Sequence, residues 1–143
     1  MKIWYGYGSE HSANLVVIGQ FEEAQDAEKA KQIIDWLTEQ VRRDIDANLL
    51  EVGEPVHGYT EGMRELLRRL DFYTLGPSEA EQFSYEVKVE VEKNRVLMTT
   101  DEYDISGFLK VLLGEGARVE VYSAHNYPGT GYGRGSKVAK PKE

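Results

Sequence analysis

Residues 84–99 read SYEVKVEVEKNRVLMT and contain the clearest structural pattern of the chain. Tyr85 and the three valines that follow it alternate with polar or charged residues. Alternation with a period of two is typical of a strand that has one face in a core and the other in water. The Lys-Asn pair at 93–94 fits a tight turn, so the segment predicts a hairpin whose return strand is 95–99.

Residues 14–21 are the second segment that indicates the fold. They contain the run Leu-Val-Val-Ile at positions 15–18, which is apolar on both faces of an extended chain. Such a run predicts a central strand that is covered on both sides. Residues 2–8 and 117–123 are also predicted as strands, and the latter again alternates apolar and polar residues.

Two longer helices and one short helix are predicted between these strands. In 24–48 the apolar residues recur every three or four positions, which places them on one side of a helix. Thr60 has the character of an N-cap, and the helix that it starts is expected to stop near Asp71. A short helix is predicted after Asp101 or Asp104. The acidic group at that point suits the first turn of a helix, and as an alternative it could hold a hard cation.

Five short strands with helices between them predict an α+β fold, namely a two-layer sandwich with a mixed five-stranded sheet and helices on one face. This arrangement resembles the ferredoxin-like type with an added helix, over residues 2–123. The resemblance concerns the architecture alone and implies no function. We expect a single α+β domain over 1–128 and a flexible Gly/Lys-rich tail over 129–143.

Composition excludes several kinds of chemistry. The 143 residues include no cysteine, which rules out disulfides, thiolate metal sites, iron–sulfur clusters and a cysteine nucleophile. The glycine-rich segment 126–137 has neither the spacing of a phosphate-binding loop nor that of a dinucleotide fingerprint. We therefore predict no cofactor and no metal.

Charge and hydropathy narrow the choice of partners. The formal net charge is −8, and the last ten residues are locally +3, so the preceding 133 residues carry −11. An acidic body repels phosphate backbones, which argues against nucleic acid as a partner. No apolar run approaches the length needed to cross a bilayer, and the N-terminus lacks the features of a signal peptide. We expect a soluble, cytoplasmic protein without a membrane partner.

The leading functional hypothesis is a non-enzymatic protein-interaction module, either a homodimer or an acidic partner or inhibitor of another protein. Alternating charges on a flat sheet suit a protein of complementary charge better than a small-molecule cavity. The predicted contact residues are Glu86, Lys88, Glu90, Arg118, Glu120, Asn126 and Tyr127.

The alternative hypothesis is a small acid–base or metal-assisted hydrolase that uses Glu10, His11 and His125. These residues are predicted in loops, where a rigid scaffold can direct catalytic groups. If the first strand runs parallel to the last, His11 and His125 emerge at the same edge of the sheet and share a site with Glu10. If the two strands are antiparallel, the histidines lie at opposite ends and cannot act together.

Overall fold

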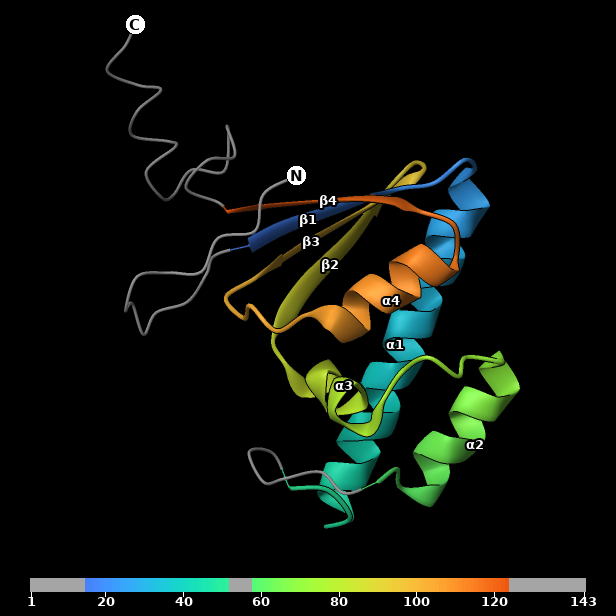
Figure 1. Cartoon of the computed structure of the whole chain (residues 1–143), viewed down its shortest axis with the longest axis vertical. Coiled ribbons are helices and arrows are strands. Elements are labelled where there is room, and N and C mark those ends of the chain that lie inside the picture. The colour runs from blue at the N-terminus through green and yellow to red at the C-terminus, as the bar shows by residue number, and fades with distance from the viewer. Residues whose placement is uncertain (1–14, 52–57, 124–143) are drawn as a thin grey trace, which may run out of the picture.

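The computed structural model describes residues 15–51 and 58–123. Within these ranges the chain has an α+β fold with four α-helices, a short 3-10 helix and a four-stranded antiparallel sheet (Figure 1). In chain order the elements are β1 (Leu15–Gln20), α1 (Ala24–Asp46), α2 (Glu61–Leu70), α3 (Pro77–Glu81), η1 (Gln82–Ser84), β2 (Val87–Glu92), β3 (Arg95–Thr100), α4 (Ser106–Gly114) and β4 (Arg118–Ser123).

The strand β1 lies at the centre of the sheet, whose order is β2-β3-β1-β4. It pairs antiparallel with both neighbours, so that Leu15 lies opposite Thr100 on one side and Ser123 on the other. Val16 on one face and Val17 on the other are 1% and 0% exposed. The prediction of a central strand covered on both faces is therefore confirmed.

The prediction of a five-stranded mixed sheet is wrong for the described chain, which has four strands and only antiparallel pairs. β3 and β4 do run in the same direction, as expected for strands joined through a helix. β1 lies between them and is antiparallel to both, so no two parallel strands become neighbours. The predicted strand 2–8, the end of the domain at residue 128 and the tail 129–143 lie outside the described residues.

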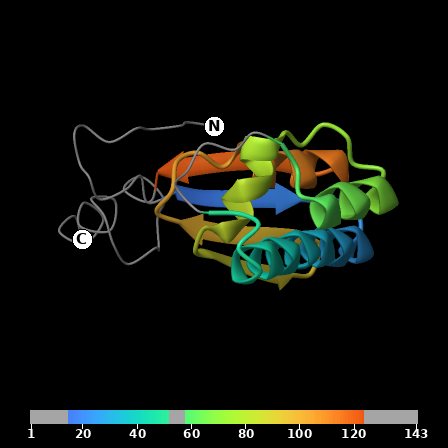
Figure 2. The same ribbon diagram turned by 90° about the horizontal axis from the view of Figure 1, so that it is seen from below.

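All described helices lie on one side of the sheet, and Figure 2 shows them in front of it. The apolar stripe of α1, with Ile34 and Leu37 at 1% and 0% exposure, packs on this side together with α4. Gly19 in β1 allows the close approach of α4, since a Cβ atom there would lie 3.3 Å from Leu112. The main core therefore lies between the sheet and the helices.

The observed helix boundaries agree with the sequence at α2 and differ at α4. Thr60 caps α2, and its hydroxyl accepts a hydrogen bond from the Met63 amide at 3.1 Å. Asp71 ends the helix in a left-handed conformation with φ of 57°. α4 begins later than predicted, with Ile105 as its N-cap, so neither candidate aspartate caps it. Asp104 instead accepts a hydrogen bond from the buried Gln82 at 2.9 Å.

The short helices α3 and η1 join α2 to the hairpin and were not predicted. Phe83 of η1 is 1% exposed, and its ring centroid lies 4.3 Å from that of Phe108 in α4. The neighbouring Gln82 side chain accepts a hydrogen bond from the Gly107 amide at 2.6 Å. This amide belongs to the first turn of α4, where backbone donors have no partner within the helix. The segment thus caps α4 from the side.

Glu79 connects α3 to α4. One carboxylate oxygen accepts hydrogen bonds from the Gly76 amide at 2.9 Å and from the Lys110 ammonium at 2.8 Å. Burial of the carboxylate raises its pKa, but the hydrogen bonds from Gly76, Lys110 and Ser106 lower it by more, so the pKa of Glu79 lies below its usual 4.5. A lowered pKa in the folded state means that the ionised carboxylate stabilises the fold.

We therefore expect Glu79→Gln to lower the free energy of unfolding by about 1 kcal/mol at pH 7. The contribution of Glu79 is present above pH 4.5 and is lost as the pH falls through the lowered pKa. Urea unfolding at pH 7 and near pH 3 should show a difference between the two proteins that shrinks in acid. A difference of equal size at both pH values would contradict the ionic role of Glu79.

Candidate functional site

The open face of the sheet, on the side away from the described helices, carries three rows of side chains. Their order follows directly from the strand register, because residues that pair across strands point to the same face. Read from β2 to β4, the rows are Lys88, Thr99, Val16, Tyr122; then Glu90, Leu97, Ile18, Glu120; then Glu92, Arg95, Gln20, Arg118.

The middle of the open face is apolar and its margins are charged. Val16 and Ile18 form a small buried cluster, against which Leu97 and Tyr122 pack. Ile18 is only 7% exposed although all described helices pack on the opposite side of the sheet. Charged residues occupy both edge strands and flank this buried cluster, so the accessible part of the face is mainly its charged rim. Exposed mixed charges of this kind can be recognised by a protein of complementary charge.

The charges of the rim are partly paired with one another. On β2, the Lys88 ammonium lies 3.3 Å from the Glu90 carboxylate, and both side chains are more than half exposed, at 72% and 55%. Arg95 and Glu92 are 3.2 Å apart across the hairpin turn. Exposed pairs of this kind contribute little to folding stability. Their charges therefore remain available to a partner.

The predicted contact residues on the strands are placed together by the register. Lys88 and Glu90 lie on the open face at one edge, and Arg118 and Glu120 lie on the same face at the other edge, all exposed. Glu86 is exposed immediately before β2. The other two predicted contact residues, Asn126 and Tyr127, lie outside the described ranges.

Glu92 and Arg95 also belong to this face but were not among the predicted contact residues. The alternation from Lys88 and the turn at 93–94 already implied their places, and the register confirms that they pair with each other.

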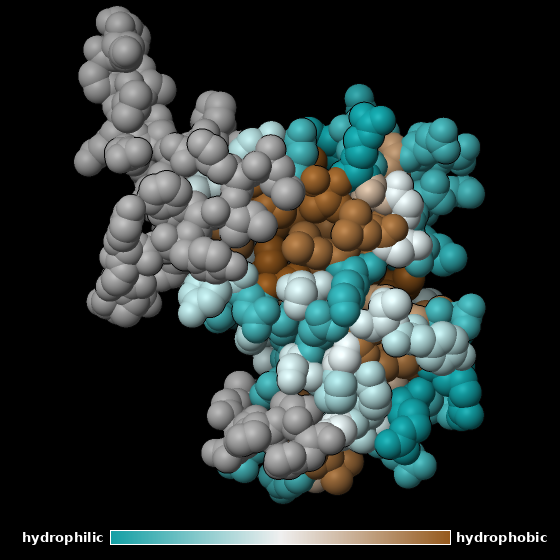
Figure 3. Space-filling model, in the orientation of Figure 1, coloured by the Kyte–Doolittle hydropathy of each residue, from teal (hydrophilic) through white to brown (hydrophobic). Residues whose placement is uncertain are grey.

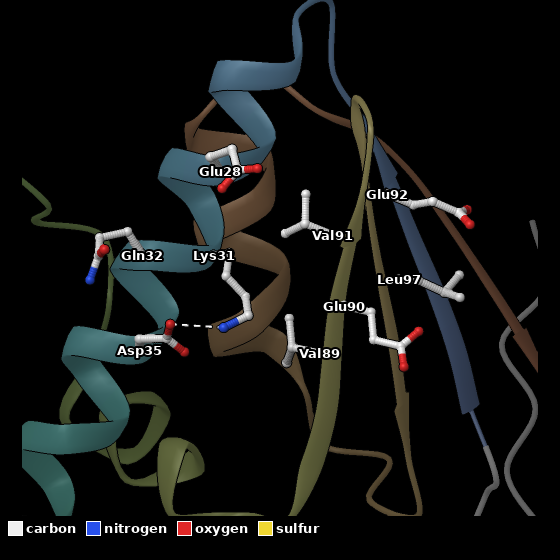
Figure 4. Close-up of a pocket in the computed structure, with 9 residues that line it drawn as sticks. All are labelled: Glu28, Lys31, Gln32, Asp35, Val89, Glu90, Val91, Glu92 and Leu97. Carbon is white, nitrogen blue, oxygen red and sulfur yellow. Dashed lines mark hydrogen bonds and ion pairs between the residues drawn. The ribbon is translucent and has the colours of Figure 1, made fainter.

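A hollow of about 530 Å³ runs along the edge of the sheet between β2 and α1 (Figure 4). The residues that line it are Glu28, Lys31, Gln32, Asp35, Val89, Glu90, Val91, Glu92 and Leu97, of which Glu90, Glu92 and Leu97 extend their side chains away from α1. Lys31 is held by Asp35 at 2.8 Å, and Val89 and Val91 form the apolar wall on the strand side. The α1 side of the hollow carries two carboxylates and one ammonium, a net negative charge, and Glu90 and Glu92 add two carboxylates on the other side of β2.

The residues of the hydrolase hypothesis, Glu10, His11 and His125, lie outside the described ranges, as does the remaining histidine, His57. Their shared site stays a hypothesis. Within residues 15–51 and 58–123, no three His, Cys, Asp or Glu residues are grouped so that they could hold a metal ion. This covers the acidic group at 99–104, where Asp104 contributes to the fold through Gln82.

Among the helices of the described ranges, none has the length and apolarity needed to cross a membrane. No curated protein and no solved structure matches the chain. One family model does match, that of a family of unknown function designated DUF6375, and it covers residues 1–134. Because this match includes most of the 143 residues, the chain belongs to the DUF6375 family.

Proposed function

We propose that this protein is a non-enzymatic interaction module that binds another protein through the open face of its sheet. The observation that carries the proposal is the arrangement of exposed charges in rows at both margins of this face of the sheet. Mixed charges at fixed spacing select a partner with the complementary pattern and determine the register in which it docks.

The net charge supports a partner with basic character. The first 133 residues carry 24 acidic and 13 basic residues, and the β2 margin of the open face adjoins the acidic hollow beside α1. An acidic surface attracts a basic protein over several ångströms and accelerates its association. A protein of this kind can mask a basic surface of its partner, as an inhibitor does. We place this activity, also as a proposal, in the cytoplasm.

The strand order supports assignment of the fold to the ferredoxin-like type, which we also propose. The elements β1, α1, β2, β3, α4 and β4 follow one another in the order of that arrangement, with a crossover helix before β2 and another before β4. In this interpretation α2, α3 and η1 are an insertion between the first helix and the second strand. The assignment concerns the architecture and adds no functional argument.

Charge reversal at the β2 margin tests the proposed surface. We expect Glu86→Lys with Glu90→Lys to leave the fold intact, since exposed substitutions typically cost less than about 0.5 kcal/mol. The double variant should no longer capture the partner that the unmodified full chain captures from the cells that produce this protein. The matched control is Glu22→Lys with Asp46→Lys, which changes the net charge equally at exposed positions away from the sheet face.

A photo-crosslinker at position 88 locates the contact on the surface itself. The same partner should crosslink at 88 and not at Asp46, which lies at the end of α1. Capture that survives the Glu86 and Glu90 reversals as well as it survives the control would contradict the proposal. Crosslinking of equal yield at both positions would contradict it as well.

A further inference from the structure

The outer edge of β4 adjoins an apolar surface. β4 is the last strand of the sheet and pairs only with β1 among the described strands. Leu113 of α4 is 57% exposed, and Leu109, Ala117 and Val119 are partly exposed. Figure 3 shows a continuous hydrophobic patch over α4 and β4. An edge strand beside such a patch offers both backbone hydrogen bonds and apolar area to another chain.

The opposite edge of the sheet lacks this combination. At β2 the helix α1 packs beside the strand, and the carboxylates of Glu28, Asp35, Glu90 and Glu92 surround this edge on both sides of the strand. Charged side chains of this kind protect an edge strand from pairing with other chains. The two edges therefore differ, and the apolar one is at β4.

Two opposite charges follow one another on the open face of β4. Arg118 and Glu120 are both exposed, and neither forms an ion pair with a residue in 15–51 or 58–123. On a strand, positions two apart point to the same side. A second strand with the same sequence in the opposite direction can therefore present the complementary charges.

Only one register satisfies these charges. If Val119 lies opposite Val119 of a second copy, Arg118 lies opposite the second copy's Glu120, and the twofold axis repeats the pair. Ala117 then lies opposite the second copy's Val121, on the helix side, so apolar residues also meet. A register two residues along places Glu120 opposite Glu120, and like charges in that position destabilise a strand pair. A shift by one residue would place each residue of the open face opposite a helix-side residue of the second copy.

We propose that the protein forms a twofold symmetric dimer through β4, with Arg118 and Glu120 paired reciprocally and the apolar surfaces of the two α4 helices in contact. The two sheets become one sheet of eight strands. Such an interface uses the same patch on both copies and closes on itself, so it limits assembly to two chains. The inference rests on the proposed interaction function and names a second copy of the chain as the partner at this edge.

Introduced cysteines test the register in the full chain, which has no cysteine of its own. Val119→Cys places two thiols opposite each other at the twofold axis, where cross-strand Cβ atoms lie about 4.5–5.5 Å apart. Mild oxidation is expected to convert most of this variant into a covalent dimer. Val91→Cys is the matched control, because Val91 occupies the same row of the helix-facing side at the other edge. Equal crosslinking of both variants would overturn the inference.

A charge exchange tests the pairing independently. In sedimentation equilibrium, Arg118→Glu is expected to raise the dissociation constant of the dimer about tenfold or more. Adding Glu120→Arg to it should restore the original value, because the same two pairs form with reversed polarity. Lys88→Glu, which breaks the corresponding pair on β2, should leave dimerisation unchanged. Circular dichroism verifies that each variant is folded.

Two further results would overturn the dimer: a wild-type chain that is monomeric at every concentration, or a double variant that does not regain dimerisation. Neither result affects the proposed function on its own. If the chain is monomeric and Glu86→Lys with Glu90→Lys still abolishes capture of a partner, the dimer is wrong and the interaction module stands. If the dimer forms and those reversals change nothing, the dimer stands and the β2 margin is not the contact surface.

Discussion

Replacement of Phe83 by alanine is expected to lower the free energy of unfolding by about 3–5 kcal/mol. The side chain is 1% exposed, and its ring packs against Phe108 at the junction of η1 and α4. Removing it leaves a cavity in the main core where η1 meets α4 and α1. Since domains of this size are stable by only about 5–15 kcal/mol, the variant should be partly unfolded at modest urea concentrations.

Urea unfolding followed by circular dichroism measures this effect. The control is Tyr73→Ala, which removes an aromatic ring that is 69% exposed and should change stability by about 0.5 kcal/mol or less. A cost below about 1 kcal/mol for Phe83→Ala would mean that the junction of η1 and α4 does not belong to the cooperative core.

Replacement of Gly107 by alanine is the second large effect that we expect, at about 2–3 kcal/mol of lost stability. A Cβ atom at this position would lie 2.8 Å from the backbone oxygen of Glu79 and 2.9 Å from the side-chain oxygen of Gln82. The first of these atoms belongs to the backbone of α3 and cannot rotate away. The substitution must therefore push α3 and α4 apart.

Gly114 in the same helix provides a control, because its replacement by alanine is not expected to lower the folding stability. A Cβ atom at Gly114, the last residue of α4, would meet nothing within 4 Å. Gly114→Ala should therefore be neutral or stabilise by up to about 0.5 kcal/mol, because alanine favours the helix. Thermal unfolding of both variants should move in opposite directions. A Gly107→Ala variant that is no less stable than Gly114→Ala would mean that the contact with Glu79 does not determine the result.

The sequence predicted those parts of the fold whose pattern is long and periodic. The hairpin of β2 and β3, the central position of β1, the helix α1 and the Thr60 cap all follow from periodicity or from a local hydrogen bond. The sheet was assigned wrongly because periodicity identifies strands but does not determine their neighbours. β1 lies between β3 and β4, so both of its edges are paired, and its apolar side chains on both faces are buried.

Elements that depend on tertiary contacts were not found. α3 has only five residues and begins with Pro77, too short for a helical period to be visible. Its position depends on the Phe83 ring and on hydrogen bonds between Gln82 and residues 22 to 25 positions away. The start of α4 was misplaced for a related reason, because Asp104 bonds to Gln82 instead of capping the helix.

The strand residues of the candidate site were predictable because alternation places them on one face. Lys88 and Glu90 required only the period of two. Arg118 and Glu120 could be placed on this face only by assuming that β2 and β4 belong to one sheet. Their position at the opposite margin depends on the strand order, which the sequence does not determine. The apolar patch at α4 was invisible in the sequence, since exposure of Leu113 depends on how much of the helix the sheet covers.

The central position of β1 has a consequence for synthesis of the protein. β1 is made first among the described strands, yet its partners β3 and β4 begin at Arg95 and Arg118. Ribosomes add roughly 5–20 residues per second, so the most apolar strand waits several seconds for its first neighbour and longer for its second. During that interval α1 is the only described helix that directly follows it and can shield one of its faces. A ribosome that stalls between β3 and β4 would therefore leave one edge of β1 open for a neighbouring nascent chain to occupy.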